Sequence, residues 1–104
     1  MSFLFTVIPF SLLISAPTPE TDLTIGQAGR EFSQTHIEVA KGTSVLFLND
    51  DNVPHNIYTN SGGKNKDLGL SKPGGKINVV FDETGMTHVR CAIHPRMKMT
   101  VKVE

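Results

Sequence analysis

Short alternations of apolar and polar residues run through the chain from residue 21 onward. The apolar runs are brief, turn-forming residues separate them, and no helical period of 3.6 residues is convincing, which together favour strands over helices. Strands are expected at residues 23–25, 37–39, 44–48, 56–59, 77–81, 86–91 and 101–103. About seven to eight short strands in one chain predict an all-β fold, a Greek-key β-sandwich or barrel.

Residues 60–76 break this rhythm, because glycine, lysine and asparagine dominate them. Few side chains in this stretch are suited to packing against a core. We therefore expect a long connection between the sheets, held to the domain by Leu68 and Leu70.

The strand expected at residues 86–91 ends at the only cysteine of the chain. Because successive side chains of a strand point to opposite faces, Thr87, Val89 and Cys91 should share one face. His88 and Arg90 should lie on the outward face. Cys91 is thus expected at the end of a strand, where the chain enters a loop.

Cys91, His94 and Met97 follow one another at intervals of three residues, and His55 lies upstream of them. Cysteine and histidine at this spacing can point at one metal ion, and the methionine can cap it across a tight loop. A thiolate, two imidazoles and a weak thioether form the ligand set of blue-copper electron-transfer sites, with the methionine as a long axial ligand. The sequence therefore predicts that these four residues bind one copper ion.

Charged residues balance in the chain, with ten Lys+Arg and ten Asp+Glu among 104 residues. There is no basic stripe of the kind that nucleic-acid-binding proteins carry, so no nucleic-acid partner is expected. The single cysteine cannot form an internal disulfide, and the sequence contains no CxxC pair. A copper ion bound to the thiol would account for such a lone cysteine.

The first sixteen residues, MSFLFTVIPFSLLISA, form an apolar run without a charged residue. A membrane-spanning helix needs about 20 apolar residues, so no stable membrane span is expected. The run is similar to the hydrophobic part of a secretory signal. We expect residues 1–20 to be an export signal, or a short hydrophobic segment that is retained. Residues 21–104 should form one copper-binding domain, exported to a bacterial periplasm.

The order of motifs in this domain resembles that of the cupredoxins, the small blue-copper proteins, above all in their plastocyanin, amicyanin and pseudoazurin branch. The stretches that carry the likeness are GQAGREF, IEVAKGTSVLFLNDDNVPHNIYT and GMTHVRCAIHPRMKMTVKVE. The order along the chain also agrees with the family: an apolar strand, an acidic turn, a His-Asn pair, a long connection and a Cys-x-x-His-x-x-Met loop. The resemblance implies an eight-stranded sandwich that binds one copper at one end and cycles it between Cu(II) and Cu(I).

The resemblance implies the same two histidines and cysteine as copper ligands, together with a methionine. The His-Pro-x-Met of a short, amicyanin-like loop selects Met97, whereas a pseudoazurin-like loop, two residues longer, would select Met99. The two methionines have the same parity along the last strand, so alternation does not decide between them. Because Pro95 matches the shorter loop, we expect Met97 as the axial ligand and Met99 as a core residue beneath the site.

Asn56, directly after the first histidine, stands where related proteins use an asparagine to bridge the two ligand loops. The exposed edge of His94, ringed by Pro54, Pro95 and Ile93, is where we expect the electron to leave. A small apolar patch there suits weak and short-lived contacts. The partners should then be redox proteins that dock transiently near His94 on a monomeric carrier.

Arg90, Arg96 and Lys98 give this end of the molecule a mild basic character, which would favour an acidic partner. The remaining histidines, His36 and His88, are interpreted as surface residues without a metal.

Two other functions would use the same residues. A copper-handling protein that stores or delivers the metal would share the ligands, but the extra runs of methionine and histidine expected of a copper chaperone are absent from the sequence. An enzyme with Cys91 as its nucleophile would need an oriented base and an oxyanion hole, neither of which the sequence suggests. We expect a small soluble electron carrier, with copper handling as the alternative, and no enzyme.

Overall fold

The computed structural model describes residues 23–104, which form nine β-strands in two sheets. In chain order the strands are β1 (Leu23–Ala28), β2 (Glu31–Phe32), β3 (His36–Val39), β4 (Thr43–Asn49), β5 (His55–Ser61), β6 (Lys64–Ser71), β7 (Lys76–Phe81), β8 (Gly85–Arg90) and β9 (Lys98–Val103). The expected N-terminal segment, residues 1–20, lies outside the described residues. Residues 23–104 contain no helix that could span a membrane.

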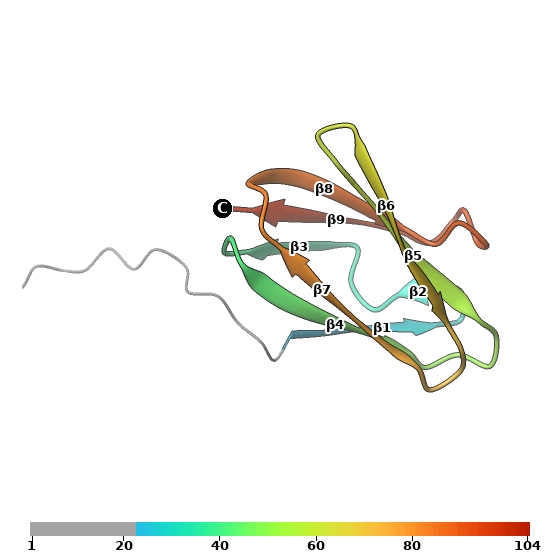
Figure 1. Cartoon of the computed structure of the whole chain (residues 1–104). Helices are drawn as coiled ribbons and strands as arrows, with labels where there is room; N and C mark the ends of the chain where they lie inside the picture. Colours follow the sequence, from blue (N-terminus) through green and yellow to red (C-terminus); the bar gives the residue numbers. More distant parts are fainter. Residues whose placement is uncertain (1–22) are drawn as a thin grey trace, which may run out of the picture.

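The two sheets face each other as the layers of a sandwich (Figure 1). One sheet has the strand order β2–β1–β4–β7, and the other has the order β3–β9–β8–β5–β6. The pairs β1/β4 and β3/β9 are parallel, and all other neighbours are antiparallel. The all-β sandwich predicted from the sequence is confirmed. The described residues form nine strands, more than the seven to eight predicted. The two-residue β2 and the polar β6 are not among those predicted, because they lack the apolar alternation that indicates a strand.

The prediction of a long connection at residues 60–76 is wrong in its first part, where the chain forms a hairpin. β5 continues to Ser61, and β6 returns antiparallel to it. Gly62 and Gly63, with φ of 56° and 82°, form the two-residue turn between them, a conformation in which glycine is favoured. β6 is an edge strand whose side chains are mostly exposed, so its polar composition gives no strand signal.

Leu68 packs against the core, as predicted, but Leu70 is 59% exposed and does not hold this segment down. The pairing of β5 with β6 shifts after Asn56, where β6 contains one residue more than β5. Gly69, with φ of 102°, lies in this bulge. The extra residue reverses the alternation of the strand, so Leu70 faces solvent and Ser71 is buried.

The core lies between the sheets and contains buried apolar residues from every described strand except β6, of which only the partly buried Leu68 packs against it. In β4 each buried residue is followed by a partly exposed one, as the period of two requires. Phe47 is fully buried and meets the ring of Phe32 edge to face at 6.0 Å, and truncating such an aromatic to alanine would cost about 3–5 kcal/mol. The same buried cluster includes Cys91 and Met97. The core therefore extends to the end of the sandwich where β8 stops and β9 begins.

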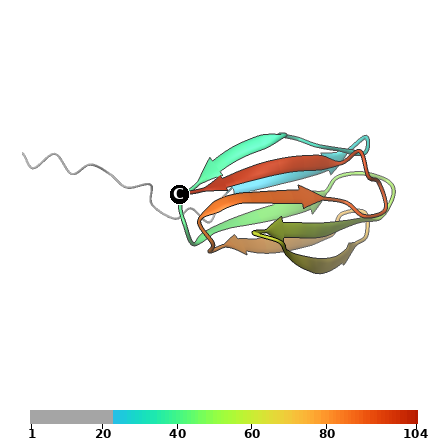
Figure 2. The same ribbon diagram turned by 90° about the horizontal axis from the view of Figure 1, so that it is seen from above.

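Four connections meet at that end of the sandwich, and they join β1 to β2, β4 to β5, β6 to β7 and β8 to β9. Backbone hydrogen bonds link the first three of them, from the Asp50 N–H to the Gln27 carbonyl (2.9 Å) and between Asn49 and residues 74–75. The C-terminus lies at the opposite end (Figures 1 and 2). The loops at the first end carry the residues that the sequence predicts as metal ligands.

Candidate metal centre

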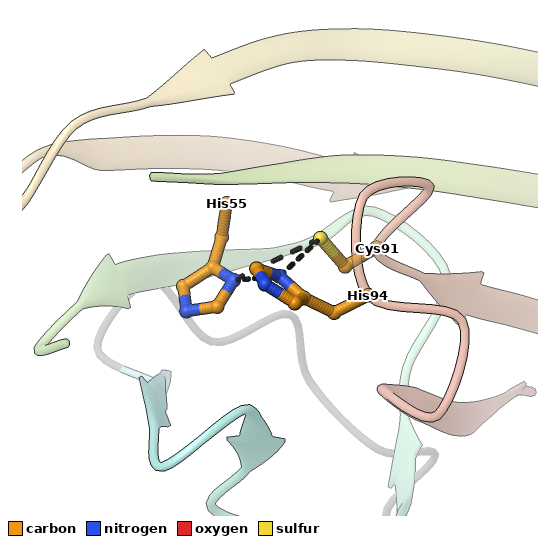
Figure 3. A group of neighbouring side chains, drawn as sticks. All are labelled: His55, Cys91 and His94. Atoms are coloured by element: carbon orange, nitrogen blue, oxygen red, sulfur yellow. Dashed lines mark hydrogen bonds between the residues drawn. The ribbon is translucent and has the colours of Figure 1, made fainter. Parts of the chain in front are cut away.

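Three of the predicted ligands converge at this end of the sandwich. His55 begins β5, Cys91 follows β8, and His94 lies in the loop before β9. The Nδ1 atoms of the two histidines are 3.0 Å apart, and each lies 3.8 Å from the Cys91 Sγ. The two rings and the thiol point toward one another (Figure 3). His55 and Cys91 are fully buried, whereas His94 is half-buried.

The spacing of these three atoms fits the ligands of one metal ion. A point equidistant from them lies about 2.1 Å from each. This is close to the zinc–imidazole distance of about 2.0–2.1 Å and slightly short of the zinc–thiolate distance of about 2.3 Å. Imidazole and thiolate donors suit copper or zinc, whereas Ca²⁺ and Mg²⁺ prefer oxygen ligands. The residues present therefore fit the copper ion that the sequence predicts.

Asp51 holds the far side of the His55 ring. Its Oδ2 lies 2.9 Å from the His55 Nε2, and the carboxylate also accepts the backbone N–H groups of Asn52 (2.9 Å) and Arg30 (3.1 Å). The hydrogen bond with His55 is the largest of the causes that lower the pKa of Asp51 to about 2. An ionised carboxylate can only accept, so His55 carries its proton on Nε2 and presents the lone pair of Nδ1 to the site. Asp51 thus selects the tautomer that a metal ligand requires.

Asn49, the last residue of β4, shapes the loop that leads to His55. Its side chain is fully buried, and its Nδ2 donates to the carbonyls of Val53 (2.9 Å) and Ser71 (2.8 Å). Its Oδ1 accepts the N–H of Asp51 at 3.0 Å. These bonds join the β4–β5 loop to the end of β6 and fix Asp51 beside the histidine.

Asn56 links the strand of His55 to the loop that contains Cys91 and His94. Its Oδ1 accepts the N–H of Ala92 at 2.7 Å, and the side chain is 6% exposed. The asparagine bridge implied by the resemblance is confirmed. It connects the neighbour of the first candidate ligand directly to the neighbour of the second.

The pairing of β8 with β9 continues into the site and distinguishes the two methionines. Within the ladder Val89 lies opposite Met99, and beyond it the Cys91 N–H donates to the Met97 carbonyl at 3.2 Å. Residues directly opposite in an antiparallel pair place their side chains on the same face. Both methionines are buried. Met97 is therefore the one across from Cys91, while Met99 lies two residues deeper in the sandwich.

Most of the chain matches the sequence model of a known protein family. Residues 19–104 match the family model of copper binding proteins of the plastocyanin/azurin family. The chain belongs to the plastocyanin/azurin family. This confirms the likeness to the cupredoxins, and it makes copper, one ion per chain, the cofactor that this cupredoxin binds.

Individual relatives agree with this assignment. Amicyanin-alpha of Methylorubrum extorquens is 30% identical over 92 residues, which cover 86% of this chain and 76% of the relative. A solved structure of a purple cupredoxin from Nitrosopumilus maritimus shares 28% identity at a TM-score of 0.70, covering 80% of this chain and 100% of the other. A mutant of amicyanin in its reduced Cu(I) form at pH 4 superimposes with a TM-score of 0.74 at 21% identity, covering 86% and 92% of the two chains. These neighbours have the fold of this cupredoxin.

His94 is the most exposed of the three converging residues of this cupredoxin. Its ring opens on a shallow depression lined by residues 29–31 and 93–96, which we call the His94 depression. The two apolar residues of the 93–96 loop line it, as expected, and Ile93 is 50% exposed. Pro54, expected in the same ring, is exposed but is not part of this lining. The turn at residues 29–31 lies there instead.

The other histidines lie away from the centre. His36 and His88 are exposed on the outer face of the five-stranded sheet, and the His36 Nδ1 lies 2.7 Å from the Thr100 Oγ1. Their interpretation as surface residues is confirmed.

Sequence reasoning assigns residues 49–52 only to a turn, and it therefore misses the roles of Asn49 and Asp51. A weak signal does exist. Asp51 lies four positions before the candidate ligand His55, and the loop between them is short. Its carboxylate can therefore reach the Nε2 of that ring.

Proposed function

We propose that this chain is a small electron carrier that holds one copper ion through His55, Cys91 and His94, with Met97 as a weak axial ligand. The observation that supports this most strongly is the convergence of three donor atoms, all within 4.8 Å of one another, in a chain of the plastocyanin/azurin family. Copper bound by such a set supplies a one-electron couple between Cu(II) and Cu(I).

Each proposed ligand is positioned by the protein itself. His55 begins a strand and its ring is fixed by Asp51. Cys91 and Met97 continue the β8–β9 ladder, and the Met97 N–H donates to the His94 carbonyl at 2.9 Å, which closes the loop. A donor set held in this way changes its geometry little between oxidation states, so little reorganisation opposes electron transfer.

The electron would leave through His94, because its ring is the proposed ligand with the most exposure. The apolar residues of the His94 depression suit a weak, transient contact with a redox protein. We propose that such partners dock there and that the carrier acts as a monomer exported to a bacterial periplasm. We propose no catalytic role, since four donors would leave no open position for a substrate.

Voltammetry of the copper-loaded chain tests this function. We expect a reversible one-electron wave and retention of the metal against a chelator over many redox cycles. A chain without a reversible wave that passes its copper rapidly to the chelator would favour copper handling instead.

A further inference from the structure

The turn between β1 and β2 has a conformation that its sequence makes costly. Its central residues, Gly29 and Arg30, have φ of 59° and 60°, and Arg30 is the one non-glycine residue among residues 23–104 with a positive φ. Two-residue hairpin turns of this kind favour glycine, asparagine or aspartate at the central positions. An arginine here is strained, and the conformation of the turn does not explain its presence.

This strained turn borders the proposed exit of the electron. It lies at the same end of the sandwich as the loop of His94 (Figure 2). Its residues 29–31 form one side of the His94 depression. The Arg30 N–H donates to Asp51, whose carboxylate in turn holds the ring of His55. The backbone of the turn is therefore tied to a proposed copper ligand, while the Arg30 side chain is exposed.

The lining of the His94 depression carries a net positive charge. Arg30 lies in the turn and Arg96 in the loop, and both are exposed. Neither forms an ion pair with another residue of the range 23–104. Glu31 is the one carboxylate in the lining. Two unpaired arginines beside an apolar centre would complement a surface with carboxylates around an apolar patch.

We propose that the His94 depression is the docking site of a redox partner whose surface carries carboxylates, with Arg30 and Arg96 receiving them beside the His94 ring. This inference rests on the proposed function. Guanidinium groups bind carboxylates through paired hydrogen bonds, which fix orientation. Charges at the rim act mainly on encounter rate and specificity, so the complex can remain short-lived. One electron passes between the copper site and the redox centre of the partner, and no bond forms or breaks.

Cytochrome c offers a matched pair of probes, because succinylation of its lysines turns a basic surface into a carboxylate-rich one around the same haem. Stopped-flow measurements would give the rate of electron exchange of each form with the copper-loaded chain. At low ionic strength we expect the succinylated form to react about tenfold faster, and at high ionic strength the difference should largely disappear.

Substitutions at the rim should act with opposite sign on the two probes. Arg30→Gln and Arg96→Gln should each slow the reaction with succinylated cytochrome c about threefold to tenfold and speed the reaction with the unmodified form. Glu31→Gln should do the reverse. Lys41→Gln removes the same charge near the C-terminus, at the other end of the sandwich, and should change neither rate. Equal effects of Lys41→Gln and Arg30→Gln would overturn the proposal, because net charge alone would then govern the rates.

Arg30→Gly separates docking from folding. Glycine adopts the observed φ without strain, so the thermal midpoint of unfolding should be unchanged or higher, while the rate with succinylated cytochrome c should fall as it does in Arg30→Gln. A rate loss that always accompanies a lower midpoint would show that Arg30 acts only through the fold.

The copper-free chain tests the docking site independently of the metal. In NMR titrations with reduced succinylated cytochrome c, amide shifts should gather in residues 29–31 and 93–96 and should vanish in the double variant Arg30→Gln/Arg96→Gln. Shifts centred on Arg90 and Lys98, on the outer face of the five-stranded sheet, would overturn the proposal. A chain that shows the expected shifts but takes up no copper would contradict the proposed function and leave the docking site in place.

Discussion

Asn56→Ala should lower both the stability of the fold and the affinity for copper, and the two losses can be measured separately. The substitution removes the acceptor of the 2.7 Å hydrogen bond from Ala92. Such a bond contributes about 0.5–1.5 kcal/mol net, and losing it costs up to about 3 kcal/mol when the partner stays buried and unpaired. Ala92 is exposed, so water can replace the lost acceptor. We therefore expect the copper-free protein to lose about 1 kcal/mol of its free energy of unfolding.

The free energy of unfolding of the copper-loaded protein should fall further, because Asn56 joins the strand of His55 to the loop of Cys91 and His94. Replacing a residue that holds metal ligands in place through hydrogen bonds typically lowers metal affinity about 10–100-fold. Binding to the folded state alone adds to stability, so this loss of affinity corresponds to a further decrease of about 1.4–2.8 kcal/mol in the loaded form.

Urea unfolding of the copper-free and copper-loaded proteins, followed by circular dichroism, measures both losses. Asn60→Ala is the matched control, because Asn60 lies on the same strand and donates to Asn65 at 2.6 Å on the exposed face. It should cost less than about 0.5 kcal/mol in either form. If Asn56→Ala lowered the stability of both forms by the same amount, the hydrogen bond would support the fold but not the metal site, and the reasoning would be refuted.

Four further substitutions probe the surroundings of the site. Met97→Leu should keep the visible colour and raise the reduction potential, because loss of a thioether weakens Cu(II) more than Cu(I); Met99→Leu should leave the spectrum unchanged and cost under about 1.5 kcal/mol. Voltammetry of both variants decides, and the opposite pattern would assign Met99 as the axial ligand. Gln27 is buried with neither amide atom hydrogen-bonded in the described structure, so Gln27→Met should raise stability by about 1 kcal/mol, or several degrees in Tm. A fall in Tm would indicate that a buried water satisfies the amide. The pKa of Asp51, about 2, lies below its ordinary value of 3.8, so its stabilisation is complete above about pH 4 and is lost as the pH falls toward 2. Asp51→Asn should therefore flatten the stability profile of the copper-free protein between these values, and parallel profiles of variant and wild type would contradict the assignment.

Much of the candidate site could be predicted because it depends on local sequence. The alternation of residues 86–91 fixes the inward face of β8, and with it the direction of Cys91 at the strand end. His94 and Met97 follow within one short loop, so their spacing already limits where they can lie. His55 is the only distant member, and the acidic turn before it marks the start of a strand.

The remainder depends on contacts between distant parts of the chain. β6 is a polar edge strand, and only its pairing with β5 makes it a strand at all. The bulge that exposes Leu70 is a mismatch of length between two strands, and neither strand shows it alone. The tie of Arg30 to Asp51 depends on a contact across 21 positions of sequence.

The absorption spectrum of the Cu(II)-loaded chain, compared with that of Cys91→Ser, tests the central claim most directly. If the thiol of Cys91 binds the metal together with His55 and His94, the wild type should take up one copper per chain and show an intense blue or green charge-transfer band between thiolate and copper. Cys91→Ser should lack this band, because serine provides no thiolate. A wild-type protein that binds Cu(II) and stays nearly colourless, with the same weak bands as Cys91→Ser, would contradict the account.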